Sequence, residues 1–467
     1  MSEQRITLPD LDDDDNATLT RLLGVINKKG RFNRKVDAYY DAERNIRATL
    51  GGVIPPQYYN LGLVLGWSAK AVDALGRRCN LDGLEWPDGD LDDLGFRELW
   101  DGNRLGSEVD QGITSTLIHA VSFVVASRGA EGEPSALIHF YDASDATGDW
   151  NPRSRRLDNL LVVNQWGEDR RASKITAYLP NRTVTGALED GKWLSDVSEH
   201  TFGVPAAPMV YKPRLRRPFG RSRISRPIRA IQDAGVRALV RLEGHSDVYS
   251  FPEFWMLGAD PSIFKNEDGS PTTQFQQMLG RIKGIPDDQE ADDPSLARAD
   301  VKKFQADSPA PHLASLNTYA KLFARESSLP DSAVAITDFA NPTSAESYDA
   351  SQYELIAESE GATDEWSPSL EDVFQVALAM QNGLTEVPAE WRSISSSWRN
   401  PRYVSRAEAA DAGMKQLTAA PELQGTEVGY ELLGLSREQI RRVQGDVRRR
   451  EARRALAGLA AATPEVE

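Results

Sequence analysis

The spacing of apolar residues changes twice along this 467-residue chain, and the change limits the folds that the chain can adopt. Between about residues 19 and 124 the apolar side chains recur every three or four positions, which predicts five successive helices. Short stretches bounded by Gly, Asp and Asn follow and read as strands, at 136–141, 159–166, 173–179 and 182–187. From residue 222 the helical spacing returns. We therefore predict an α+β fold in which residues 17–215 supply first helices and then an antiparallel sheet.

Local signals give the expected ends of several helices. The first helix is expected to end near Gly30, the second to span about 31–46, and the fifth to continue through Val124. Residues 1–16 are acidic and are expected to fray. Further boundaries are predicted at Ser367-Pro368 (a start), at Gly383 (an end), and at the capping pairs Thr343 with Glu346, Ser405 with Glu408, and Ser436 with Gln439.

Composition excludes several classes of protein. A formal net charge of -16 argues against a chain that, as a whole, grips nucleic-acid phosphates. Cys79 is the one cysteine, so the fold has no intrachain disulfide and needs no oxidising compartment. No apolar stretch approaches the roughly 18 residues of a membrane span. Four aspartates at 12–15 stand where a signal peptide would be basic and then apolar, so we expect synthesis inside the cell and no membrane partner.

Signatures of catalysis are missing from the sequence. It has no phosphate-binding glycine loop, no HExxH helix and no GxSxG elbow. None of the five histidines has a histidine or cysteine at metal-ligand spacing, and His119 is expected to be a hydrogen-bonded core histidine. Cys79 is expected to be a small buried hydrophobe. The sequence therefore predicts no enzyme, no catalytic residue, no metal and no cofactor.

Charge is distributed unevenly along the chain. Residues 212–229 carry eight basic side chains and no acid, whereas residues 326–391 carry fourteen acids and no Lys or Arg. Residues 437–454 contain eight arginines and three acids, at the spacing of an ordinary amphipathic helix. Each of these charge blocks can also be interpreted simply as a surface that is exposed to solvent. The missing cations of 326–391 indicate either a neighbour that supplies arginines or a surface that must not hold polyanions.

Several short runs occur in an order that is typical of one family. They are His200-Thr-Phe-Gly-Val-Pro, Pro208-Met-Val-Tyr, Gly220-Arg-Ser-Arg-Ile-Ser, Ile231-Gln-Asp-Ala, Leu329-Pro-Asp, Asn341-Pro-Thr-Ser-Ala-Glu and Trp398-Arg-Asn-Pro. Over about residues 17–445 the chain resembles the portal (head-to-tail connector) proteins of tailed bacteriophages, of the type found in actinobacteriophages and siphophages. No single run is decisive, and the specificity lies in the ordered set.

The resemblance implies a phage portal fold, made of an α+β wing, a two-helix stem, a clip and a helical crown or C-terminal region. On this sequence the parts are an acidic tail at 1–16, the wing at 17–220, the stem helices at 221–249 and 312–326, the clip at 250–311, a tunnel loop at 327–342, a long wing helix region at 343–385, and the crown with the C-terminal helices at 386–467.

The resemblance also implies a function. Portal subunits form a ring, usually a dodecamer, at one capsid vertex of the virion, and double-stranded DNA passes through the ring without sequence specificity. The ring is the channel for genome packaging and ejection. Its implied partners are the major capsid protein, the terminase or packaging motor, and head-tail adaptor proteins. Synthesis in the cytoplasm of the host bacterium follows from the same resemblance.

Two sets of candidate site residues follow from charge and position. A channel that lets DNA slide must not bind phosphates strongly, so a loop of small, apolar and acidic residues suits its narrowest part. The expected loop residues are Pro330, Asp331, Val334, Ile336, Asp338, Phe339 and Asn341. The expected contacts with a neighbouring subunit or with DNA are Arg214, Arg216, Arg217, Arg221, Arg223 and Arg226. We favour the neighbour, because a closed ring needs complementary surfaces on each subunit.

Two other functions stay open at this stage. A minor capsid or adaptor protein that forms no ring would bind only other capsid proteins. A DNA-packaging nuclease or ATPase is less favoured, since it needs phosphate-binding glycines or clustered metal carboxylates.

Overall fold

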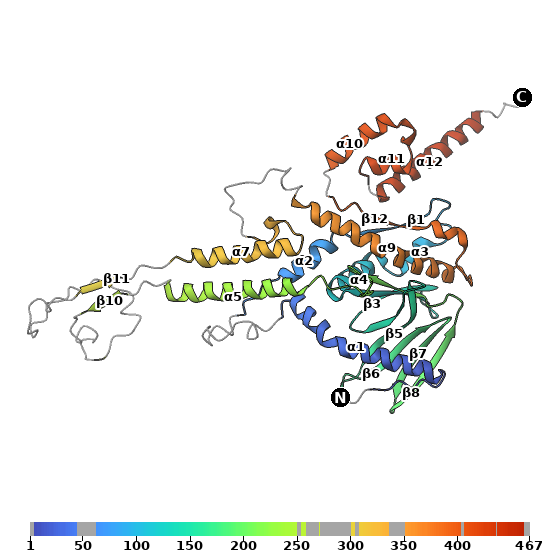
Figure 1. The fold of residues 1–467 in the computed structure, drawn as a ribbon. Helices are drawn as coiled ribbons and strands as arrows, with labels where there is room; N and C mark the ends of the chain where they lie inside the picture. The colour runs from blue at the N-terminus through green and yellow to red at the C-terminus, as the bar shows by residue number, and fades with distance from the viewer. Residues whose placement is uncertain are drawn as a thin grey trace, which may run out of the picture. The chain divides into compact units, whose positions relative to one another are not determined.

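The structure is a computed structural model that describes residues 4–43, 62–249, 254–257, 270, 300–303, 308–335, 351–402, 406–435 and 437–461. The chain divides into two compact units, Met1–Arg399 and Asn400–Glu467 (Figure 1). The fold class is α+β, as predicted. Before the projecting helix pair, the first unit contains α1 (Asp13–Tyr40), α2 (Trp67–Gly76), β1 (Leu81–Glu85), α3 (Phe96–Gly102), α4 (Leu105–His119), β2 (Val121–Arg128), β3 (Ala136–Asp142), β4 (Ala146–Asn151), β5 (Arg156–Trp166), β6 (Ala172–Leu179), β7 (Arg182–Glu189), β8 (Lys192–Glu199) and β9 (Ala206–Val210).

Two antiparallel sheets form the centre of this unit. One has the strand order β3-β2-β9 and the other the order β4-β5-β6-β7-β8. All four strands expected from the sequence are present, at 136–142, 156–166, 172–179 and 182–189. The prediction that the fifth helix continues through Val124 is wrong. Ala120 has φ 83° and ends α4. The side chains of β2 then point alternately to the two faces of the sheet, and both faces are buried there.

Helix α1 and the N-terminal segment cover the five-stranded sheet. The predicted break near Gly30 is wrong, because α1 is one helix to Tyr40 and keeps the same face buried through Ile26, Asn33 and Val36. A helical Gly costs only about 1 kcal/mol relative to Ala, which this packing outweighs. Asp12 caps the helix by accepting a hydrogen bond from the backbone N–H of Asp15 at 2.8 Å.

The expectation that residues 1–16 fray is also wrong for the part described. Ile6, Leu8 and Leu11 are buried in the same cluster as α1 and the sheet. The Gln4 side chain donates to the carbonyl of Ala172 and accepts from its N–H, both at 2.8 Å. The acidic run starts only after these apolar residues, so net charge was a poor guide to the order of the segment.

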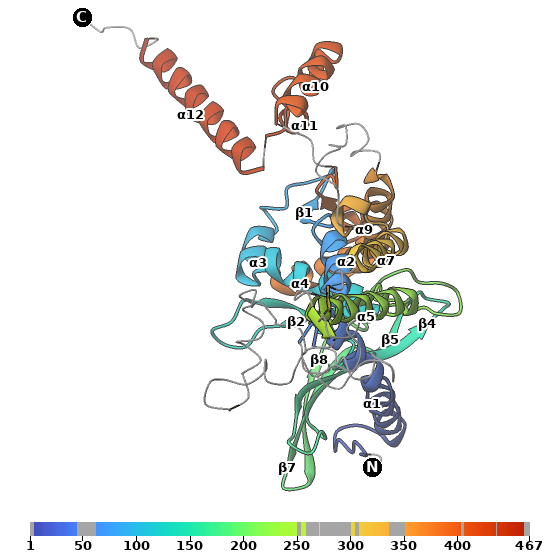
Figure 2. The same ribbon diagram turned by 90° about the vertical axis from the view of Figure 1, so that its left-hand side faces the viewer.

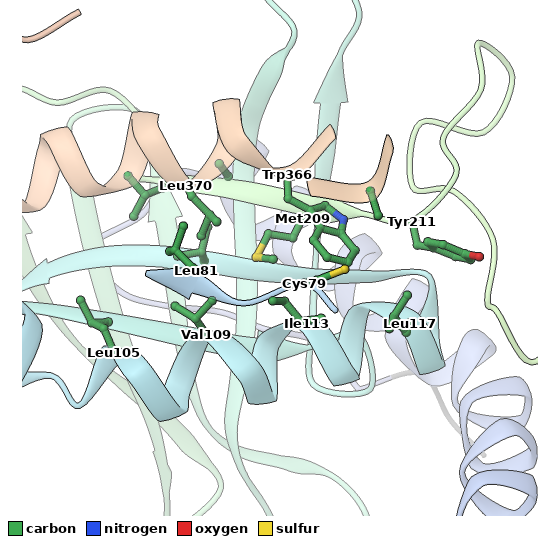
Figure 3. Packing of buried hydrophobic residues seen from close by; sticks show 14 of the residues in the cluster. Cys79, Leu81, Leu105, Val109, Ile113, Leu117, Met209, Tyr211, Trp366 and Leu370 are labelled. Atoms are coloured by element: carbon green, nitrogen blue, oxygen red, sulfur yellow. The ribbon is translucent and has the colours of Figure 1, made fainter. Parts of the chain in front are cut away.

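Helix α9 (Tyr353–Gln381) packs against the three-stranded sheet on the same face as α4, and both helices share a cluster with Val124 and Met209 (Figure 3). In Figure 3, Trp366 of α9 points toward Met209 and Cys79 and Leu370 toward Leu81, while Val109 and Ile113 approach from α4. The indole N–H of Trp366 donates to the carbonyl of Val210 at 2.8 Å. Cys79 is a buried free cysteine, as expected, and burial raises its pKa to about 12.

The predicted helix start at Ser367-Pro368 is wrong, because Pro368 lies inside α9. Proline removes one helical hydrogen bond and costs about 3 kcal/mol. Here it lies on the exposed face of the helix, and the buried residues on either side of it, Trp366 and Leu370, hold the helix together. The predicted end at Gly383 is confirmed: its φ of 67° places it in the left-handed region, and the N–H of Leu384 returns to the carbonyl of Ala379 at 2.9 Å.

A pair of helices projects from the first unit (Figure 1). They are α5 (Arg226–Tyr249) and α7 (Ala310–Glu326), close to the two helices that the sequence predicted. The helices lie side by side, and near their outer ends the rings of His245 and His312 lie 5.1 Å apart. Beyond them, β10 (Phe254–Leu257) pairs antiparallel with β11 (Asp300–Lys303). The rest of 250–307, apart from Ser270, lies outside the described residues.

The first unit ends with η5 (Ala389–Ser393) and β12 (Ser395–Trp398), and β12 pairs with β1. This compact unit thus extends to Arg399. The second unit contains α10 (Arg406–Ala419), η6 (Pro421–Leu423), α11 (Glu427–Leu432) and α12 (Arg437–Ala461). Helices follow both predicted capping sites, although Ser405 and Ser436 themselves, like Thr343, lie outside the described residues.

His119 at the end of α4 joins three elements of the body. Its Nε2 lies 2.6 Å from Asp37 of α1 and its Nδ1 lies 2.6 Å from Asp142 of β3. Its side chain is only 6% exposed. The expectation of a hydrogen-bonded core histidine is thus confirmed. Burial lowers the pKa of His119, but the hydrogen bonds and charges of the two carboxylates outweigh burial and raise the pKa to about 9.

We predict that this histidine makes stability depend on pH above neutrality. A raised pKa means that the contribution is complete below the unfolded value of 6.5 and is lost as the pH rises through 9. The free energy of unfolding should fall by about 3 kcal/mol over that window in the native chain and much less in His119→Gln. Urea unfolding at several pH values measures this difference, and parallel profiles for the two proteins would contradict it.

Candidate functional site

The arginine-rich stretch begins in a closed loop between β9 and α5, defined here as the basic loop, residues 212–221. Its tip is a tight turn in which the N–H of Arg217 donates to the carbonyl of Arg214 at 2.6 Å. At its base the N–H of Arg221 donates to the carbonyl of Tyr211 at 3.0 Å. Gly220 has φ 62°, and an added Cβ would lie 2.2 Å from that carbonyl, so the closure requires glycine.

The basic loop presents its charges to solvent. Arg214, Arg216, Arg217 and Arg221 are all exposed, as is Arg226 at the start of α5. None of these five forms an ion pair with a described residue. Leu215 at the tip is fully exposed, at 104% of its reference area. The loop is thus a rigid cationic projection with an apolar tip, suited to an anionic partner surface.

Arg223 differs from the expectation for the stretch. It is 4% exposed, so it cannot reach a neighbouring subunit or DNA. Its Nε donates to the carbonyl of Ala71 at 2.8 Å and its Nη2 to the carbonyl of Ser327 at 2.7 Å. Its Nη1 lies 2.7 Å from both the Tyr211 hydroxyl and Glu358 Oε1. One guanidinium therefore bonds α2, the end of α7, the residue after β9, and α9.

Glu358 is the acidic partner in this cluster. Its Oε1 accepts a hydrogen bond from the Tyr211 hydroxyl at 2.5 Å and pairs with Lys212. Burial raises its pKa, but Arg223, Lys212 and Tyr211 outweigh burial and lower the pKa to about 2. Glu358 therefore stays ionised at any physiological pH. Glu358 also explains in part why residues 326–391 need no cations of their own. Two cations of the basic stretch, Lys212 and Arg223, pair with this acid within the same chain.

The sequence contained a signal for Glu358 that the charge count missed. Leu355, Glu358 and Ala362 follow at the spacing of three and four that places residues on one face of a helix, and Leu355 and Ala362 are buried. A carboxylate on the apolar face of a helix requires a buried partner. The sequence did not identify that partner, because the fold of the 134 residues between Arg223 and Glu358 decides which cation lies beside the carboxylate.

The candidate loop residues are only partly described. Pro330 is buried, Asp331 is exposed, and Val334 is half-buried. Asp331 opens a short 3-10 turn, η4 (Asp331–Ala333), which begins five residues after the last residue of α7. Four of the seven expected residues, namely Ile336, Asp338, Phe339 and Asn341, lie outside the described residues. The base of this segment is fixed, because the carbonyl of Ser327 accepts from Arg223 and Leu329 is buried in the main core.

The described ranges contain neither a candidate metal site nor a candidate membrane span. Within those ranges, no group of three or more His, Cys, Asp or Glu side chains has an arrangement that holds a metal ion. No described helix combines the length and the apolarity needed to cross a bilayer.

An α+β body from which a helix pair projects has the architecture of the connector class that the sequence resembles. The chain matches the family model described as phage portal protein, SPP1 Gp6-like, over residues 29–421, and it belongs to that family.

Two curated relatives carry the name portal protein. The chain is 26% identical to the one from Mycobacterium phage D29 over 422 residues, which cover 88% of this chain and 84% of the relative. It is 25% identical to the one from Mycobacterium phage L5 over 418 residues, which cover 87% and 83%. The expected actinobacteriophage type is confirmed by these relatives.

Solved structures of a gene transfer agent particle resemble the fold. A chain from the neck of the empty particle has a TM-score of 0.42 and 13% identity, and the match covers 84% of this chain and 99% of that one. A chain from the neck of the native particle has a TM-score of 0.39 and 15% identity, with 79% and 90% covered.

We predict that removing Arg223 destabilises the body far more than removing an exposed arginine. Arg223→Ala leaves the Glu358 carboxylate buried without its main partner, which should cost about 3–5 kcal/mol of the free energy of unfolding. Arg153→Ala, at an exposed turn, is the matched control and should cost less than about 0.5 kcal/mol. Urea unfolding measures both.

A double variant separates the lost charge pair from lost packing. Arg223→Met with Glu358→Leu removes both charges, and it should cost less than Arg223→Ala alone because no lone buried charge remains. An Arg223→Ala protein as stable as the control would contradict the assignment.

Proposed function

We propose that this chain is the subunit of a portal ring at one vertex of a phage capsid, through which double-stranded DNA enters and leaves. Its membership of the portal family over residues 29–421 is the observation that carries the proposal. The two curated portal proteins support it, since each matches more than four fifths of this chain. In this proposal the protein is structural, has no catalytic activity of its own, and is a component of the virion made in the host cytoplasm.

The parts of the subunit take the roles that the family resemblance implies. The body formed by residues 17–220 and α9 is the wing, and α5 with α7 is the stem. The region that contains β10 and β11 is the clip, which binds the packaging motor and the head-tail adaptors. Residues 386–467, which include the second unit, are the crown and C-terminal region. The ring binds the major capsid protein around its circumference, and twelve copies are the usual number in the family.

The segment after α7 is the proposed tunnel loop, at 327–342. Exposed Asp331 lies five residues after the end of the stem, while Arg223 fixes the segment's base to the wing. An acidic loop on a fixed base contacts passing DNA and still repels its phosphates. The match to the portal family favours this proposal over the two alternatives, an adaptor that forms no ring and a packaging enzyme.

We predict that the purified full chain forms closed rings. A subunit that must enclose DNA needs head-to-tail contacts that close, so light scattering after size-exclusion chromatography should give a mass of many subunits. Negative-stain images should show a central hole. A protein that stays monomeric over a wide range of concentration and salt, and that forms no ring in assembled particles, would contradict the proposal.

We predict that positive charge in the tunnel loop slows DNA without preventing assembly. Asp331→Lys with Asp338→Lys adds phosphate contacts, which are screened least at low salt. Packaging of DNA into capsids should fall most at low ionic strength, while ring formation stays normal. The control, Asp331→Asn with Asp338→Asn, removes the acids without adding cations and should package nearly normally. Normal low-salt packaging by the Lys variant would place the loop away from DNA.

A further inference from the structure

A second charged surface lies far from the basic loop, and it has the opposite sign. Residues 88–101, defined here as the acidic segment, run from the end of β1 through α3. The segment carries six exposed acids: Asp88, Asp90, Asp92, Asp93, Glu98 and Asp101. Arg97 is its single cation and pairs with Asp101 at 3.6 Å. Partly buried Leu91 and Leu94 lie between the carboxylates and pack on the main core.

The acidic segment is held in a defined shape. The N–H of Phe96 returns to the carbonyl of Leu91 at 3.1 Å, and Gly95 has φ 71°. The Gln381 side chain at the end of α9 donates to the carbonyl of Gly95 at 2.8 Å. The Asn382 side chain donates to the carbonyl of Leu94 at 3.0 Å. These bonds fix the carboxylates relative to the C-terminal end of α9.

Helices α4 and α9 place the basic loop and the acidic segment near opposite ends of the body. Helix α4 starts next to α3, and at its other end the carbonyl of Leu117 accepts from Arg223, just after the basic loop. Helix α9 contacts the start of the basic loop through Glu358 and contacts the acidic segment through Gln381. It rises about 35 Å between those two residues. In Figure 2, α3 and the green connection between β9 and α5 lie on opposite sides of the body.

This placement is what a closed ring requires. In a ring each subunit contacts its two neighbours through two different surfaces on opposite flanks, and those surfaces must be complementary. Opposite charge steers and orders such a contact. We propose that the basic loop of one subunit docks on the acidic segment of the next, with the tip residue Leu215 against Leu91 and Leu94. The inference rests on the proposed ring and names the surfaces that close it.

A second copy fits the basic loop better than DNA does. DNA would pair with the basic loop only. The six exposed carboxylates of the acidic segment would then have no cations from outside that segment. A neighbouring subunit brings cations to those carboxylates and covers Leu215 in the same contact. The basic loop holds no acid and the acidic segment holds one cation, so like-to-like contacts between two loops or two segments are repulsive.

Charge reversal of each flank tests the proposal directly. The loop-reversed chain is Arg214→Glu with Arg216→Glu and Arg217→Glu. The segment-reversed chain is Asp88→Lys with Asp92→Lys and Asp93→Lys. In either chain alone, every contact is like against like, so the concentration needed for half-assembly should rise by about a hundredfold or more. Light scattering after size-exclusion chromatography measures it on the full-length chains.

Mixing the two chains is the decisive step. In a 1:1 mixture each contact can again join opposite charges, provided that the two chains alternate, so rings should reappear. Native mass measurement with one chain tagged should then show equal numbers of both chains. A single chain carrying both sets of changes should form rings by itself. These results require that the two surfaces meet, because general damage to either chain predicts no recovery on mixing.

Matched controls and the opposing outcomes complete the test. Arg153→Glu with Arg155→Glu and Arg170→Glu reverses three other exposed arginines and should leave assembly unchanged. Thermal unfolding of each variant checks that the chain is folded. Normal rings from either reversed chain overturn the inference, and normal rings that no longer pass DNA would assign the loop to the channel instead. Failure of the mixture to recover also overturns it. Absence of rings from the native chain would overturn the proposed function itself.

Discussion

The body of this protein depends on one buried cation. Arg223 lies at the point where α2, the end of α7 and α9 meet, and its guanidinium bonds to the carbonyls of Ala71 and Ser327 and to Glu358. A buried guanidinium is costly unless its donors have partners. The chain segments that supply those partners must therefore come together with it. The bond to Ser327 has a further effect, because it fixes the point where α7 ends and the proposed tunnel loop begins.

Much of the fold followed from periodicity and from single turn residues. The four expected strands, the helix pair and the left-handed Gly383 depend on local rules that neighbouring residues satisfy by themselves. The errors have a common cause, which is packing at a distance. Gly30 and Pro368 are local helix breakers, yet each lies in a helix whose buried residues on both sides hold it against a sheet. Ile6 and Leu8 could be placed only by knowing that the sheet of residues 146–199 was there to receive them.

The charge of the candidate site could be predicted from the sequence, but the residues that pair with its arginines could not. The cation-rich and acid-rich stretches were evident, and five of the six arginines are exposed as a contact surface requires. The sixth, Arg223, is next to exposed arginines in sequence and yet is buried. Composition alone could not separate it from them, because burial depends on Glu358, which enters from another part of the chain. The placement of α3 and the basic loop on opposite sides of the body is likewise a property of the fold, and no spacing of residues along the chain encodes it.

The N-terminal segment has a consequence for how the protein is made. Gln4 bonds to Ala172, and the indole N–H of Trp193 donates to the carbonyl of Arg5 at 3.2 Å. Gln4 and Arg5 are therefore synthesised more than 160 residues before the strands that they contact. During that interval the apolar face of α1 has no sheet to cover it. The aspartates at 12–15 give the waiting helix a charged start, which favours its solubility until β6, β7 and β8 emerge. Completion of the sheet that covers α1 thus requires the end of β8, and a chain truncated earlier leaves α1 without its partner.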